Sequence, residues 1–470
     1  MIILLNSDSP HYLQIYHHIK REIISENLQL NDKLPSIRKL AKFLNISTTP
    51  VELAYQLLLS EGFVESRPRA GYFVQKIPAP YTRLEIQKDD KLSSTTSYPS
   101  RDENKYLYDF HISKIDRSVF PTKTWKKLFS EALTDEHFEL DYGNPQGEKG
   151  LRQEIANYLH HFRGVRCFPD QIVIAGDQSF LIFILSSLLL QNYRELAIEN
   201  PGYMLVPSLF QRMGYTILPL SLDNDGINIH HLEESGSRLV VTTPSYQFPT
   251  GTMMSLERRI ALLEWANKTN GYIIEDDYDG EFRYYGEPLP SLQGLDPNTN
   301  VIYLGGFSQV LAPAISIHYM VLPENLLEDY HRLRIELMLE QSSSRMQQKT
   351  LQRFIEEGFL AKHVRKLRQL YMEKHDKLVS SLEKYLSEKV TVVGSGAGFH
   401  IVIQVNDCRT SDELVTLAKG VGVRVINGAF YWSKPLEFSP TIMIGFAGIP
   451  LHSIDDGIKT LASAWFPNQK

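Results

Sequence analysis

Residues 272–279 have the sequence YIIEDDYD, in which a short apolar run is followed at once by carboxylates. Similar runs occur at 172–174 (IVI), 239–241 (LVV) and 301–304 (VIYL), and longer amphipathic stretches separate them. Such runs are typical of strands buried on both faces, and strands that alternate with helices predict parallel pairing. We therefore expect an α/β domain with a mainly parallel sheet over residues 107–470.

The first 76 residues show a different pattern. Apolar residues recur at helical spacing from 12 to 24, and again in a short helix that starts at Ser36. A turn at 45–46 separates this helix from a third one, which Ser47 is expected to cap. Three short helices of this kind, followed by two short strands around a Pro/Gly segment, predict a winged helix-turn-helix (α+β) over residues 1–76.

Two short helices joined by a tight turn allow the second helix to enter a DNA major groove. The candidate DNA-binding residues are Ser47, Thr48 and Thr49 at the start of the third helix, for base edges, and Arg38, Lys39, Arg67 and Arg69 for phosphates. The alternative is a helix-turn-helix used only for protein contacts, with basic residues that are simply solvated.

Length and composition indicate an ordinary globular protein of more than one domain. The chain has 470 residues, of which 43% are hydrophobic and 22% charged. Residues 77–106 are rich in Pro, Ser, Thr and charge, which predicts a linker. Residues 1–76 hold nine Lys/Arg and seven Asp/Glu, a charge of +2, so the total of −6 leaves −8 for the rest. This asymmetry permits DNA binding at one end.

Membrane, export and disulfide signals are weak. The longest nearly apolar run, Phe180–Leu190, is much shorter than the roughly 20 residues that span a bilayer. Met1–Leu5 lacks a basic flank and a cleavage site, so export is not expected. Cys167 and Cys408 lie at unrelated positions, which argues against a disulfide framework or a thiolate metal site. We expect a cytoplasmic protein without a bound metal.

Four segments of the N-terminal region resemble a GntR-type winged helix domain: 12–16 (YLQIY), 34–41 (LPSIRKLA), 54–56 (AYQ) and 62–68 (GFVESRP). The sequence departs from that family at Thr48 and Pro50, where Arg and Thr are usual, and at Arg69, where Gly is usual. These departures leave the operator preference open.

From about Tyr108 onward the chain resembles a fold-type-I aminotransferase, in the form that is fused to GntR-type domains in MocR-type transcription regulators. The segments that carry this resemblance are 141–147 (DYGNPQG), 200–203 (NPGY), 243–251 (TPSYQFPTG), 275–282 (EDDYDGEF) and 305–309 (GGFSQ). Their order and spacing extend through nearly the whole domain.

The resemblance implies a pyridoxal phosphate pocket. Asp276 would hold the pyridine nitrogen, Tyr278 the ring hydroxyl, and Tyr203 would stack on the ring. The helix N-terminus at Gly176-Asp177-Gln178 would hold the phosphate. The structural alternatives are a turn or helix-cap aspartate, buried core aromatics and an ordinary strand-to-helix loop.

Several positions of that pocket carry the wrong residue. The motif that usually ends Phe-Ser-Lys ends here at Ser308 and Gln309, 33 residues after Asp276. An amide cannot form an imine. By resemblance, Ser316 stands where an arginine usually reaches the phosphate, Met443 where an arginine usually clamps a substrate carboxylate, and Gly306 where a small hydroxyl residue is usual.

These features together predict a dimeric DNA-binding regulator whose aminotransferase-like domain has no catalytic residues. No covalent cofactor is expected, and noncovalent pyridoxal phosphate is the weaker expectation. The expected partners are operator DNA, a second copy of the chain and a small-molecule effector. Two alternatives stand beside it: an active aminotransferase with an appended DNA-binding domain, and a scaffold without an effector.

Overall fold

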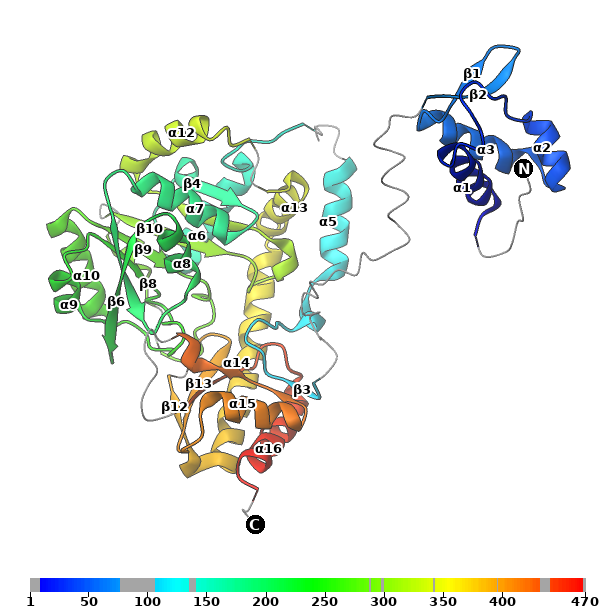
Figure 1. Cartoon of the computed structure of the whole chain (residues 1–470). Coiled ribbons are helices and arrows are strands. Elements are labelled where there is room, and N and C mark those ends of the chain that lie inside the picture. The colour runs from blue at the N-terminus through cyan, green and yellow to red at the C-terminus, as the bar shows by residue number, and fades with distance from the viewer. Residues whose placement is uncertain are drawn as a thin grey trace. The chain divides into compact units, whose positions relative to one another are not determined.

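The computed structural model describes residues 9–76, 106–134, 141–286, 289–296, 300–340, 343–394, 396–431 and 440–467. The chain divides into two compact units, with the division between residues 102 and 103 (Figure 1). The predicted linker, residues 77–106, lies outside the described residues except for Tyr106.

The first unit contains the predicted helices and hairpin. Its elements are α1 (His11–Ile24), α2 (Ile37–Leu44), α3 (Thr48–Ser60), β1 (Val64–Arg67) and β2 (Gly71–Val74), with the two strands antiparallel. The apolar faces of the helices meet in one core, which includes the fully buried Ile15, Val51 and Leu58. The winged helix-turn-helix prediction is therefore confirmed.

Local backbone geometry explains the turns of this unit. Asn45 ends α2 in the left-handed region at φ 53°, which asparagine tolerates better than most residues. Ser36 caps α2 by accepting a hydrogen bond from the Lys39 N–H. Ser47 is the N-cap residue of α3, but its side chain makes no capping hydrogen bond, so that detail of the prediction is wrong. Arg69 has φ 61° at the wing turn, a conformation that costs glycine little.

The second unit is built on an eight-stranded sheet with the order β4-β11-β10-β9-β8-β5-β6-β7. The strands are β4 (Ile172–Ala175), β5 (Glu195–Asn200), β6 (Thr216–Asp223), β7 (Gly226–Ile227), β8 (Leu239–Thr242), β9 (Tyr272–Asp276), β10 (Val301–Gly306) and β11 (His318–Val321). β5, β6, β8, β9 and β10 pair parallel, while β11 and β7 pair antiparallel with their neighbours. The predicted strands and the mainly parallel sheet are confirmed.

Helices flank this sheet and continue to the C-terminal part (Figure 1). They are α5 (Thr122–Thr134), α6 (Lys149–Arg163), α7 (Gln178–Leu189), α8 (Leu205–Arg212), α9 (Ile229–Glu234), α10 (Leu256–Thr269), α11 (Leu292–Leu295), α12 (Leu327–Glu336), α13 (Arg345–Glu356), α14 (Phe359–Leu386), α15 (Ser411–Gly420) and α16 (Ile454–Trp465). The run Phe180–Leu190 forms most of α7 and its C-cap residue, and it packs into the core.

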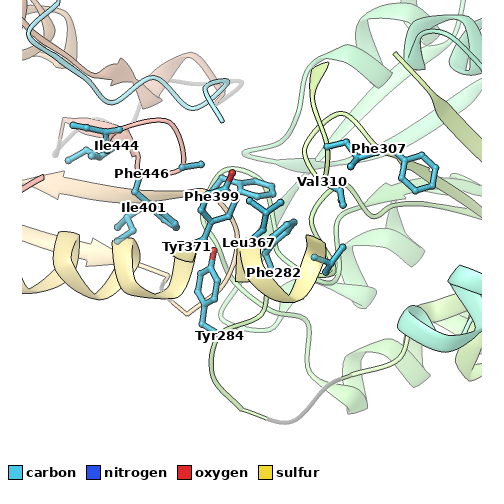
Figure 2. Close-up of a cluster of buried hydrophobic side chains, with 14 of the residues drawn as sticks. Phe282, Tyr284, Phe307, Val310, Leu367, Tyr371, Phe399, Ile401, Ile444 and Phe446 are labelled. Carbon is cyan, nitrogen blue, oxygen red and sulfur yellow. The ribbon is translucent and has the colours of Figure 1, made fainter. Parts of the chain in front are cut away.

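A second, antiparallel sheet follows α14 and was not predicted. It has the order β12 (Val390–Val393), β13 (His400–Val405), β16 (Thr441–Gly445) and β15 (Ile426–Asn427), and the short strands β3 (Tyr108–Asp109) and β14 (Val423–Arg424) pair parallel. Figure 2 shows side chains of α14 lying between this sheet and the loop after β9. Phe282 lies 5.5 Å from Tyr371 and 4.8 Å from Phe399, measured between ring centroids. This cluster joins the two sheets into one unit.

Across the described residues, no helix is both long and apolar enough to cross a membrane. Within the same part of the chain, no group of three or more His, Cys, Asp and Glu side chains is arranged to hold a metal ion. Cys167 and Cys408 are free thiols.

Candidate functional site

A cavity of about 390 Å³ lies where the parallel strands of the large sheet end. This edge is where open α/β sheets place their ligands. Six predicted pocket residues line it: Gln178, Tyr203, Asp276, Tyr278, Ser308 and Gln309. The rest of the lining is His111, Ile112, Ser113, Phe248, Gly305, Gly306, His318, Phe399, His400 and Tyr431.

Asp276 is the last residue of β9 and is only 4% exposed. Gln178, the first residue of α7, donates from Nε2 to the carboxylate, 3.2 Å from each oxygen. Burial, together with the carboxylates of Asp277 and Glu199, raises the pKa of Asp276 to about 7, although the Gln178 hydrogen bond acts to lower it. Asp276 therefore lies at a strand end rather than in a turn or a helix cap, and its carboxylate faces the cavity.

The residue after Asp276 anchors the strand end instead of facing the cavity. Asp277 accepts hydrogen bonds from Arg163 Nε at 2.6 Å and from the Tyr303 hydroxyl at 2.5 Å. All three side chains are buried. Burial acts to raise the pKa of Asp277, but the Arg163 guanidinium outweighs burial and keeps that pKa below its usual range. This ion pair holds the backbone at the end of β9 in place, and with it the orientation of Asp276 toward the cavity.

Four aromatic side chains form one wall of the cavity. Phe248 is central: its ring centroid lies 4.8 Å from that of Tyr431, 5.5 Å from Tyr203 and 6.1 Å from Tyr278. The Tyr278 hydroxyl donates to the backbone carbonyl of Tyr246 at 3.3 Å. These rings, which come from the loops after β5, β8 and β9 and from the segment Gly428–Tyr431, give the cavity an aromatic surface.

The segment after β10 contributes Gln309. Its Oε1 atom is buried and has no hydrogen-bond partner among the described residues. Nearby, Ser308 Oγ lies 3.0 Å from His318 Nε2. A β-carbon on Gly306 would lie only 2.6 Å from His318 Nδ1, so the histidine ring occupies the space of a side chain at 306. Burial lowers the pKa of His318, which favours the neutral ring.

The N-terminus of α7 is already occupied by the chain's own carboxylate. Asp177 is the N-cap residue, and its Oδ1 accepts from the Ser179 N–H at 2.7 Å. This hydrogen bond lowers the pKa of Asp177, so the side chain is ionised. Beside it, Ser316 is left-handed at φ 55°, and its hydroxyl donates to the Gly176 carbonyl at 2.5 Å. Gly176 and Asp177 therefore adjoin the cavity rather than line it.

Met443 lies away from the lining, in the middle of β16. It is fully buried and packs with Phe248 and Val402. The position for which the resemblance implied an arginine is thus part of an apolar core.

The side chains around the cavity do not fit pyridoxal phosphate bound as an imine. Among the described lining residues there is no lysine, and an imine requires a primary amine. The helix terminus expected to hold phosphate carries the Asp177 carboxylate, which would repel that anion. The sequence predicted Gln309 at the lysine position by resemblance, but it predicted neither the capping by Asp177 nor the position of His318, because both depend on three-dimensional contacts.

The candidate DNA-binding residues of the first unit are all exposed: Arg38, Lys39, Ser47, Thr48, Thr49, Arg67 and Arg69. Thr48 and Thr49 open α3. Arg67 differs from the other cations because it is already engaged: it pairs with Glu65, donates to Asn31 Oδ1 at 2.7 Å and lies over the Phe73 ring. Arg38 and Lys39 lie in the first turn of α2, are exposed, and form no ion pair among the described residues.

Comparison with protein families gives two matches along the chain. Residues 11–74 match the model for bacterial regulatory proteins of the gntR family, and residues 111–448 match the model for aminotransferase class I and II. The gntR match covers the winged helix-turn-helix unit, and the aminotransferase match covers both sheets of the second unit.

Similar proteins share this whole arrangement. The uncharacterized HTH-type transcriptional regulator YdeL of Bacillus subtilis is 38% identical over 97% of both chains. The probable rhizopine catabolism regulatory protein MocR of Rhizobium meliloti is 29% identical over 99% of this chain and 96% of its own length. The HTH-type pyridoxine biosynthesis transcriptional regulator PdxR of Corynebacterium glutamicum is 28% identical over 92% of this chain and 91% of its own length.

Solved structures confirm the fold of the second unit. Kynurenine aminotransferase of Pyrococcus horikoshii superposes with a TM-score of 0.69 at 24% identity, covering 84% of this chain and 96% of that one. An archaeal alanine:glyoxylate aminotransferase gives a TM-score of 0.71 at 24% identity, with 78% and 92% covered. The second unit has the fold-type-I aminotransferase architecture.

Proposed function

The chain belongs to the family of HTH-type transcriptional regulators that carry a gntR-family domain before an aminotransferase class I and II domain, and we propose that its second unit is a pseudo-aminotransferase that dimerises the regulator and senses a small molecule. The observation that carries the regulatory function is the 38% identity to such a regulator over 97% of both chains. Residues 1–76 act as the DNA-reading domain, 77–106 as the linker and 107–470 as the dimerisation and effector domain. Action on DNA would place the protein in the cytoplasm.

Several contacts support the loss of aminotransferase chemistry. Gln309, at the position that the resemblance assigns to the cofactor lysine, lies in the same cavity as Asp276, Tyr203 and Tyr278. Ser316 and Met443 stand where cationic partners of phosphate and substrate carboxylate were expected. Each charge-assisted hydrogen bond that is missing removes about 1.5–3 kcal/mol. The retained aspartate and tyrosines then line an effector pocket, and pyridoxal phosphate is not needed as a resident cofactor.

Exposed apolar side chains on the second unit support the dimer. Tyr142 is 76% exposed, Ile335 71% and Met338 83%. Tyr142, Met338 and Phe180 also line a surface hollow of about 350 Å³. Large exposed apolar side chains gathered in one region are typical of a subunit interface.

The second unit alone should therefore form the dimer. We expect residues 107–470 to sediment as a dimer at micromolar concentration, because the exposed side chains of this unit supply the contact. Met338→Glu should shift the equilibrium toward monomer, since a charge at a buried apolar interface is costly. Leu417→Glu, which changes an exposed residue of α15, serves as the matched control and should leave the dimer intact. A monomer in the absence of residues 1–106 would move dimerisation to the first unit.

DNA binding tests the regulatory function directly. Replacing Thr48 and Thr49 with Ala should abolish sequence preference, because base contacts are worth about 1–3 kcal/mol each. Arg38→Ala should weaken binding to every duplex and reduce the slope of its salt dependence by about 1. Arg67→Ala, whose side chain is engaged within the unit, should lose less than Arg38→Ala. Fluorescence anisotropy of the full-length protein over a salt series measures all three, and indifference to duplex DNA at low salt would refute the function.

A further inference from the structure

The described lining of the cavity at the strand ends has one carboxylate, that of Asp276, and neither lysine nor arginine. Two of the lining histidines are biased toward the neutral form: burial lowers the pKa of His318, and it lowers the pKa of His400 to about 4. The neighbouring charges that act on Asp276 are the carboxylates of Asp277 and Glu199, so the described residues give it no counter-ion.

A second acceptor faces the same cavity. Gln309 Oε1 is buried and has no hydrogen-bond partner among the described residues, and a buried acceptor without a partner costs about 1–3 kcal/mol. The Asp276 carboxylate, when it is ionised, can only accept hydrogen bonds. Two acceptors in one cavity are best satisfied by a ligand group that carries more than one N–H donor.

The aromatic wall of the same cavity suits a positive charge. Phe248 has Tyr203, Tyr278 and Tyr431 around it at centroid distances of 4.8–6.1 Å. Aromatic faces attract cations, and clustered rings are the usual enclosure for ammonium groups. The hydroxyl of Tyr278 is already committed to the Tyr246 carbonyl, which leaves the ring as its contribution to the wall.

Both positions at which an anion would be held are closed to it. The ionised Asp177 carboxylate caps α7 at one end. The position of the expected carboxylate-binding arginine is Met443, which is fully buried in an apolar cluster. The site therefore offers acceptors and rings but no anion clamp.

We propose that this cavity binds a small aryl or alkyl ammonium ion that carries neither phosphate nor carboxylate, with its N–H groups between Asp276 and Gln309 and its apolar body on the Phe248 wall. This inference rests on the proposed effector-sensing function and names the ligand class for that same site. The selectivity is the reverse of that of an aminotransferase, whose substrates and cofactor are anions.

Three isosteric probes test the charge preference: benzylamine, benzyl alcohol and benzoate. Calorimetric titration of the full-length protein above neutral pH should show benzylamine binding at least about tenfold more tightly than either of the others, a difference of about 1.4 kcal/mol. Benzyltrimethylammonium, which keeps the charge but has no N–H donor, should bind between benzylamine and benzyl alcohol. Equal affinity for the three isosteres, no response to any at millimolar concentration, or a preference for benzoate would overturn the proposal.

Substitutions of the cavity residues test whether benzylamine binds at this site. Asp276→Asn keeps the shape and the Gln178 contact but removes the charge, so benzylamine should lose about tenfold in affinity while benzyl alcohol is unchanged. Gln309→Met should weaken benzylamine but not benzyltrimethylammonium, because only the former can donate to the lost oxygen. Asp225→Asn, which removes an exposed carboxylate between β6 and β7, is the matched control and should not affect benzylamine. Unchanged benzylamine affinity in Asp276→Asn would place the binding elsewhere.

A DNA-binding measurement on the same protein separates failure of this inference from failure of the proposed regulatory function. Duplex DNA binding at low salt is measured in parallel. Retained DNA binding without selectivity for the ammonium probe overturns the inference alone, whereas loss of both overturns the proposed function.

Discussion

The purified protein is expected to be colourless and to form no imine with pyridoxal phosphate. Gln309 has a neutral amide that cannot condense with an aldehyde, and the described cavity lining has no lysine to replace it. Incubation with pyridoxal phosphate should therefore produce no visible absorption band that belongs to the protein. Borohydride reduction followed by peptide mass mapping should find no lysine adduct in the cavity, and no pair of amino acid and keto acid should be transaminated.

Restoring the lysine alone should achieve little. In Gln309→Lys, the phosphate would still meet the Asp177 carboxylate, and Ser316 would still donate to the Gly176 carbonyl instead of binding an anion. Adding arginine at positions 316 and 443 supplies the missing charges, but neither position accommodates an arginine side chain well. Ser316 has φ 55°, a strained region for arginine, and Met443 is fully buried beside Phe248.

We therefore expect the triple variant to lose stability before it gains activity, because burying an unpaired charge costs several kcal/mol. Thermal denaturation alongside the absorption spectrum separates the two effects. A stoichiometric imine in the unmodified protein, mapped to another lysine, would show that the cofactor is bound by a different residue and would contradict the pseudo-aminotransferase proposal. Transaminase activity of the unmodified protein would favour the enzyme alternative.

The elements that sequence predicted are those whose signal is local. Strand β9 could be recognised because Tyr272, Ile273 and Ile274 form a short apolar run ending in carboxylates. The hairpin wing followed from short runs on either side of a turn segment. Asp276 could be placed at a strand end for the same reason, and Gln309 by its position in a motif. Periodicity and motif spacing need no knowledge of distant contacts.

The features that sequence missed depend on residues far apart in the chain. The antiparallel sheet of β12, β13, β15 and β16 has short strands, and the large core cluster that includes Phe282 and Phe399 joins it to the rest. The His318 ring fills the space above Gly306 from a neighbouring strand, which no local pattern indicates. Ser47 has the right residue type and position for a cap, but its side chain makes no capping hydrogen bond. Such outcomes are decided by tertiary geometry rather than by propensity.

Removing the charge of Asp276 should stabilise the protein by an amount that grows as the pH rises from about 4 to 7 and is complete above pH 7. The folded-state pKa of Asp276 is raised to about 7 by burial, against 3.8 for the ordinary group. The folded protein therefore keeps this proton at pH values where the unfolded chain has lost it, and the free energy of unfolding falls as the pH rises from about 4 to 7. Each unit of pKa difference corresponds to about 1.4 kcal/mol, so a difference of about three units makes the full penalty above pH 7 on the order of 4 kcal/mol.

Asp276→Asn removes this penalty and keeps an acceptor for Gln178, so its gain in unfolding free energy should appear at pH 8 and vanish near pH 4. The titratable groups that face Asp276 are Glu199 of β5, Asp277, Tyr203 and Tyr278. Burial also raises the pKa of Glu199, so the quantity to measure is the difference in unfolding free energy between wild type and variant at each pH.

Asp177→Asn should change the stability in the opposite direction. The Asp177 carboxylate has a lowered pKa and caps α7, so this variant should lose up to about 1 kcal/mol of unfolding free energy at neutral pH. Denaturant unfolding at pH 5 and pH 8 compares the three proteins. A gain of equal size at both pH values would mean that packing, rather than the buried charge, limits the stability of this site.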